Sequence, residues 1–83
     1  MNEMDLRRAV GFLQDGDWQA AHEIVQRDEG SAPACWAHGI VHLMEGDLPN
    51  ARYWYKKAGR AFSEDLPAEL EALSASLGDC LKR

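Results

Sequence analysis

Residues 36–59 read WAHGIVHLMEGDLPNARYWYKKAG, and this stretch decides the fold. Apolar residues recur at three- and four-residue steps on both sides of the pair Gly46-Asp47. Glycine supplies the left-handed conformation that ends many helices, and an aspartate can accept the free N–H groups at the start of the next helix. The stretch therefore predicts two helices joined by a tight turn.

A weaker copy of the same pattern lies upstream. Residues 12–26, FLQDGDWQAAHEIVQ, align with residues 42–56, HLMEGDLPNARYWYK, so that Gly16 matches Gly46 and Ala21 matches Ala51. A stop-and-cap pair followed by a small residue at a fixed distance is more specific than shared hydrophobicity. A helix pair repeated in this way stacks into successive layers.

The apolar periodicity predicts an all-α chain of five helices in one domain, residues 1–83, and no sheet. The last helix carries a continuous leucine stripe and begins after a polar break. The expected helices cover residues 3–15, 18 to a stop at Gly30, 32–45, 48 to 59 or 61, and 66–82.

The second copy resembles the tetratricopeptide repeat family and, more loosely, the SEL-like repeats. Gly39, Gly46, Ala51, Tyr55 and Ala58 occupy, in order, the small and aromatic places of the family pattern. The resemblance implies two helix-turn-helix repeats, residues 2–30 and 31–61, stacked as a right-handed α/α superhelix. The helix at 66–82 would then cap the stack.

The resemblance also implies a site. In this family peptides bind the groove formed by the first helix of each repeat, so the chain is expected to be a non-enzymatic protein-interaction module with no cofactor. The last helix could fill the groove, or a second copy could cover it in a homodimer formed through the groove or through Leu70, Leu73 and Leu77. The matching groove positions are Leu6, Val10, Leu13, Trp36, Ile40, Leu43 and Met44.

Composition limits the cellular setting. The chain has 83 residues and a net charge of −5, which does not favour nucleic acid as a partner. No apolar run reaches the roughly 18 residues of a membrane helix, and the N-terminus lacks the pattern of a signal peptide, so we expect a cytoplasmic protein without membrane contact. Cys35 and Cys80 are expected as reduced thiols, with a bridge between them left open.

A second hypothesis concerns metal. Cys35, His38 and His42 are spaced i, i+3, i+7, which places a thiol and two imidazoles on one helix face. Zn²⁺ or another transition metal uses such ligands. The alternative is that these residues pack between paired helices and that the histidines hydrogen-bond to neighbouring side chains.

A third hypothesis concerns the basic segment Arg52–Arg60, in which four cations cluster with Tyr53 and Trp54. Such a segment could bind nucleic acid by base stacking and phosphate contact, although a solvated helix face whose cations favour the C-terminal end of the helix explains it better. No phosphate-binding loop or nucleophile motif is present, so nothing in the sequence favours an enzyme. The partner and the pathway are not encoded in any of these patterns.

Overall fold

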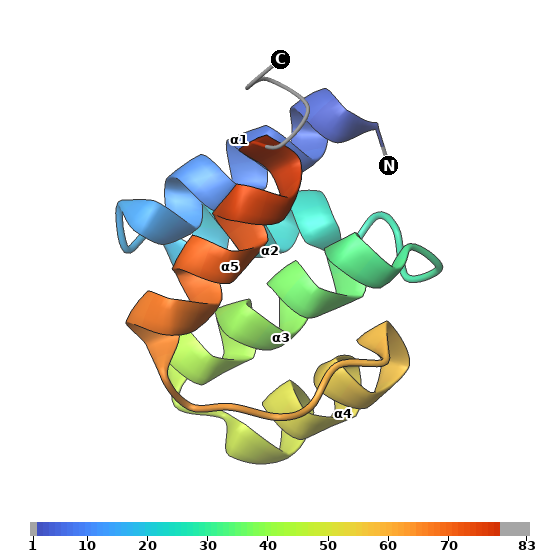
Figure 1. The fold of residues 1–83 in the computed structure, drawn as a ribbon, viewed down its shortest axis with the longest axis vertical. Coiled ribbons are helices and arrows are strands. Elements are labelled where there is room, and N and C mark those ends of the chain that lie inside the picture. The colour runs from blue at the N-terminus through green and yellow to red at the C-terminus, as the bar shows by residue number, and fades with distance from the viewer. Residues whose placement is uncertain (1, 79–83) are drawn as a thin grey trace.

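A computed structural model describes residues 2–78, and within this range the chain forms five helices and no strand (Figure 1). The all-α fold predicted from the periodicity is therefore confirmed. The predicted continuation of the last helix to residue 82, with Cys80 and Leu81, lies outside the described residues. The helices are α1 (Glu3–Gln14), α2 (Trp18–Val25), α3 (Ala32–Glu45), α4 (Leu48–Ala58) and α5 (Leu66–Gly78).

Side-chain caps fix where the helices begin. Asp17 accepts a hydrogen bond from the Ala20 N–H at 3.1 Å, and Asp47 accepts one from the Asn50 N–H at 3.3 Å. Gly46 ends α3 in the left-handed conformation, with φ of 89°. In the repeated glycine-aspartate pair, the aspartate therefore caps the start of the next helix, as the sequence predicts.

Helix α2 ends earlier than predicted. It stops at Val25 rather than at Gly30, and its C-cap residue Gln26 keeps a right-handed conformation. The Asp28 carboxylate accepts hydrogen bonds from the N–H groups of Gly30 and Ser31 at 3.0 and 3.1 Å. Such local side-chain bonds offer the backbone an alternative to further helix, which explains the loop before α3.

Helix α3 is central, because it contacts each of the other four described helices (Figure 1). Its approach to α4 depends on Gly39, where an added Cβ would lie 2.5 Å from the Tyr55 ring and 3.3 Å from the Ala51 carbonyl oxygen. Only glycine allows the two helices to pack this closely. Tyr55 is consequently one of the largest fully buried side chains.

Helix α5 lies across α1 and α3, on the face where the resemblance places a peptide groove (Figure 1). Leu73 is fully buried there, while Leu70 and Leu77 are partly buried against the same core. Of the seven predicted groove residues, Trp36 and Met44 are partly buried. The other five are buried: Leu6, Val10, Leu13, Ile40 and Leu43.

A buried carboxylate anchors α5. Glu69 is 5% exposed and accepts hydrogen bonds from Trp36 Nε1 at 3.1 Å, from the Tyr55 hydroxyl at 2.7 Å, and from Arg60 Nε and Nη2 at 2.9 Å each. The Arg60 hydrogen bond is the main reason why the pKa of Glu69 is lowered. We call Glu69, Trp36, Tyr55 and Arg60 the Glu69 network. Every polar group in it that faces the protein interior has a partner.

Candidate metal centre

All three histidines of the chain meet where α2 packs against α3. His22 comes from α2, and His38 and His42 come from α3. One ring nitrogen of each lies within 4.8 Å of the others, and the ring centroids are 4.9 to 5.4 Å apart. We call these three residues the histidine cluster.

Helix geometry explains the cluster. His38 and His42 are four residues apart on α3 and so share a face of that helix. His22 directly follows Ala21, which is fully buried where α2 packs into the core. His22 therefore lies at the edge of the apolar face of α2, where it contacts His38 and His42 on α3.

His38 is the most enclosed member of the histidine cluster. It is 3% exposed, and the Trp54 indole stacks on its ring with a centroid distance of 3.9 Å and an interplanar angle of 10°. Its Nδ1 atom has no hydrogen-bond partner among the described residues. A buried polar atom left in this state costs about 1–3 kcal/mol, so the site keeps an unused donor or acceptor at the expense of stability.

Burial also sets the protonation of His38. Desolvation, followed by the nearby His42, His22 and Lys57, lowers the pKa of His38 to about 4. The imidazole is therefore neutral at pH 7. Neutral imidazole is the form that binds a metal ion.

His42 has a carboxylate partner. Its Nδ1 atom lies 2.8 Å from Glu45 Oε1, which leaves Nε2 for the histidine cluster. A carboxylate behind a histidine fixes the orientation of the ring and raises its basicity, and metal-bound histidines usually have such a partner. Glu45 and Asp47 form a second possible set of ligands with His42, but Asp47 already accepts two hydrogen bonds from Asn50.

Cys35, which the sequence groups with His38 and His42, is not part of the histidine cluster. Its thiol donates to the Glu29 carbonyl oxygen at 3.3 Å, and burial raises the pKa of the Cys35 thiol. The physical reason is position along the axis. Cys35 lies one turn nearer the start of α3, and its short side chain leans toward that end, so it reaches the loop before α3 rather than α2.

His22 was missed from the sequence. It lies outside the apolar stripe of α2, a position typical of a solvated residue, and the structure has it partly buried. The only available signal was the alignment of α2 beside α3 implied by the internal repeat. That alignment does not specify which margins of the two helices meet.

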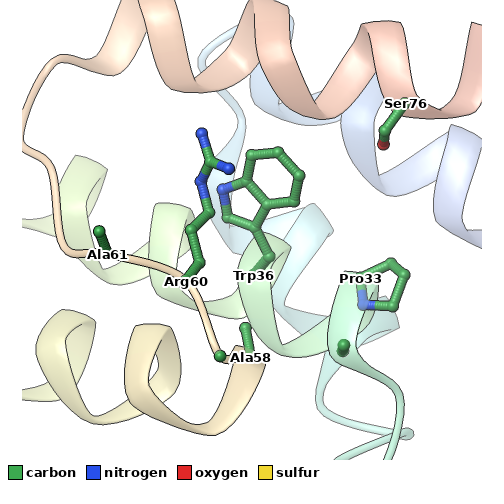
Figure 2. A pocket seen from close by; sticks show the side chains of 8 residues that line it. Pro33, Trp36, Ala58, Arg60, Ala61 and Ser76 are labelled. Carbon is green, nitrogen blue, oxygen red and sulfur yellow. The ribbon is translucent and has the colours of Figure 1, made fainter.

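A second feature is a pocket of about 450 Å³ at the edge of the Glu69 network (Figure 2). The Arg60 guanidinium lies over the Trp36 ring, 3.8 Å from its centroid, and forms one wall. No histidine lines this pocket. The lining consists of Ala32, Pro33, Trp36, Ala58, Gly59, Arg60, Ala61 and Ser76.

The basic segment of α4 is largely engaged with the protein itself. Arg52 stacks over Phe62 at 4.4 Å, and Lys57 Nζ lies 4.9 Å from the centroid of the buried Trp54 ring. Tyr53 is 54% exposed, whereas Trp54 is 8% exposed and stacks on His38. Tyr53 is therefore the one exposed aromatic ring of the segment, and Lys57 Nζ lies 5.9 Å from its centroid.

No protein-family model matches this chain, and neither a curated protein nor a solved structure is significantly similar to it. None of the helices within residues 2–78 combines the length and apolar character needed to cross a bilayer. The function of the protein is therefore proposed from the chemistry of the histidine cluster and of the pocket beside Trp36.

Proposed function

We propose that this protein binds a first-row transition metal ion through His22, His38 and His42. The observation that carries the proposal is the convergence of every histidine of the chain, from two helices, on one point. Helix packing brings the three rings together, and the hydrogen bonds of the structure leave the buried Nδ1 atom of His38 without a partner among the described residues. Two α3 histidines one turn apart and a third from α2 form a set that Zn²⁺, Cu²⁺ or Ni²⁺ accepts.

The geometry fits with a small adjustment. Zn–N bonds of about 2.0–2.1 Å place the nitrogens of a tetrahedral site about 3.3 Å apart. The three nitrogens lie within 4.8 Å of one another, a difference that rotation of the rings can close. A bound ion would also give His38 a reason to keep a buried nitrogen without a protein partner.

The test is a calorimetric titration of the untagged protein with Zn²⁺ at pH 7. We expect one ion per chain. We expect His22→Ala to weaken binding by more than about 100-fold, because loss of a ligand exceeds the 10–100-fold effect of losing a residue that hydrogen-bonds to a ligand. Cys35→Ala is the matched control and should leave the affinity within about threefold, since its thiol faces Glu29.

Two outcomes would overturn this assignment. Absence of stoichiometric Zn²⁺ binding by the wild-type protein would remove the metal function. A loss of affinity in Cys35→Ala together with an unchanged His22→Ala would replace the histidine cluster with the Cys35, His38 and His42 set. Circular dichroism of each variant checks that its helices are retained, and His22 is exposed enough that its truncation should not unfold the chain.

We propose protein interaction as a second function, because the pocket beside Trp36 and Arg60 offers aromatic and apolar surface at the end of the predicted groove. In this proposal the two helix pairs act as a tetratricopeptide-like unit in the cytoplasm, where a reduced Cys35 is expected. A homodimer would use the partly exposed Leu70 and Leu77, because Leu73 is buried within the chain.

Light scattering across concentration tests the homodimer, and a pull-down with wild-type protein and Trp36→Ala tests a partner. A monomer at high micromolar concentration excludes the homodimer. Captured proteins that are unaffected by Trp36→Ala would exclude this pocket as the interaction site.

A further inference from the structure

We infer that the metal centre is open: a small anion from solution, not a fourth side chain, completes the coordination of the ion. This inference rests on the proposed metal function and specifies the ligand class of that same site. Three observations support it: the neighbouring ligand atoms already have hydrogen-bond partners, His22 is partly exposed to solvent, and the site with its ion carries a net positive charge.

The described residues near the histidine cluster offer three candidates for a fourth ligand, and each has another partner. The Cys35 thiol donates to the Glu29 carbonyl oxygen, and Glu45 holds His42 Nδ1. Asp47 accepts from both the backbone and the side-chain amide of Asn50, so moving it would uncap α4. Recruiting any of them would break an existing interaction.

Solvent can reach the site from one side. Trp54 covers the His38 ring, so that face is closed. His42 is 9% exposed, and His22 is more exposed than His42. His22 is thus the member of the histidine cluster through which we infer that a ligand from solution approaches the ion. Three protein ligands with an accessible remaining position is the composition of catalytic zinc sites, whereas structural sites use four protein ligands.

Charge favours an anion. Three imidazole ligands add no charge to the +2 ion. The nearby charged groups are the carboxylates of Glu45 and Asp47 and the ammonium of Lys57, which lies over the Trp54 ring that stacks on His38. Together with the ion they leave a net positive charge at the site. Hydroxide or another small anion neutralises such a centre, and metal-bound water is correspondingly acidic.

The test is the visible absorption of the Co²⁺-loaded protein, with azide as the probe anion. We expect a saturable change in the cobalt ligand-field bands as azide is added, and no thiolate-to-cobalt charge-transfer band in the near ultraviolet. The same azide response is expected in Cys35→Ala and in Cys80→Ser, because the inferred fourth ligand is an anion from solution and not a thiol.

The alternatives are distinguishable. Co²⁺ bands that do not respond to azide, or a charge-transfer band that disappears in Cys35→Ala or Cys80→Ser, would show a closed site and overturn this inference while leaving metal binding intact. Absence of any Co²⁺ spectrum in the presence of excess metal would overturn the inference together with the proposed function.

Discussion

Among the described residues, the Glu69 network and the histidine cluster lie on different sides of α3. They differ in how many of their buried polar atoms have hydrogen-bond partners. His38 and Trp36 are two residues apart on this helix and so point about 200° apart around its axis. On the Trp36 side, Glu69 accepts four hydrogen bonds from three side chains. On the His38 side, the buried Nδ1 atom has no hydrogen-bond partner within residues 2–78.

This contrast indicates different roles. A fully satisfied network stabilises one arrangement of helices, which is what the docking of α5 requires. An unsatisfied buried nitrogen weakens the fold, so its retention is better explained by a ligand. The Glu69 network is accordingly interpreted as structural, and the histidine cluster as functional.

The largest expected effect is that of Glu69→Ala. It removes the acceptor for Trp36, Tyr55 and Arg60 and leaves buried donors without a partner, so we expect the free energy of unfolding in urea to fall by about 4 kcal/mol. Glu71→Ala, an exposed site on the same helix, is the control and should change stability by less than about 0.5 kcal/mol. Equal effects of the two substitutions would contradict a structural role for the network.

In the metal-free protein, His38 and Glu69 should make stability depend on pH in two different ranges. The pKa of His38 is about 4 in the folded protein and 6.5 for an ordinary histidine in the unfolded chain, so the unfolded chain binds more protons between these values. Stability should therefore be full above pH 6.5 and fall by about 3 kcal/mol as pH drops to 4. The groups facing His38 are His22, His42 and Lys57.

Glu69 responds in a lower window. Its pKa is lowered from 4.5, so its stabilisation is present above pH 4.5 and is lost only as pH falls through the lowered value. Urea unfolding at several pH values measures both windows. His38→Phe should abolish the loss between pH 6.5 and 4, and a loss that persists in this variant would assign it to another group.

Gly39→Ala should disturb the packing of α3 against α4. An alanine Cβ would meet the Tyr55 ring and the Ala51 carbonyl oxygen, so we expect a loss of about 2 kcal/mol despite the better helix propensity of alanine. Gly11→Ala is the matched control, because a Cβ at Gly11 meets nothing within 4 Å. It should stabilise α1 by up to about 1 kcal/mol, and thermal unfolding compares the two variants.

The smallest expected effects come from His38→Phe and Tyr55→Phe, which remove one polar group from the histidine cluster and one from the Glu69 network. The two substitutions should change stability in opposite directions. His38→Phe retains a ring to stack on Trp54 and removes the unpartnered nitrogen, so the metal-free protein should gain about 1 kcal/mol at pH 7. Tyr55→Phe loses the hydroxyl that donates to Glu69 and should cost about 1 kcal/mol. If both substitutions destabilise the protein in urea, the two groups do not differ as inferred.

Local signals made the fold predictable from sequence. The caps at Asp17 and Asp47 and the stops at Gly16 and Gly46 act within one turn of the chain, and the structure has them where the sequence does. The end of α2 was predicted incorrectly at Gly30. There the Asp28 side chain, not glycine, sets the backbone path.

The sites were less predictable because they depend on contacts between distant residues. The spacing of His38 and His42 indicated a shared face, but His22 and Cys35 could be assigned only after α2 and the loop before α3 were positioned. The Glu69 network joins residues 9, 14 and 33 positions apart along the chain. No periodicity encodes such pairings.

Trp54 and Tyr55 are neighbours on α4, yet Trp54 stacks on His38 and Tyr55 donates to Glu69. Both residues lie on α4, which packs closely against Gly39, so we expect a shift of this helix to move both side chains. If the histidine cluster binds an ion as proposed, ion binding and the docking of α5 should therefore be thermodynamically linked. An ion that favours one position of Trp54 would then stabilise the matching position of α5. By linkage, docking of α5 in that position would increase the affinity for the ion by the same free energy.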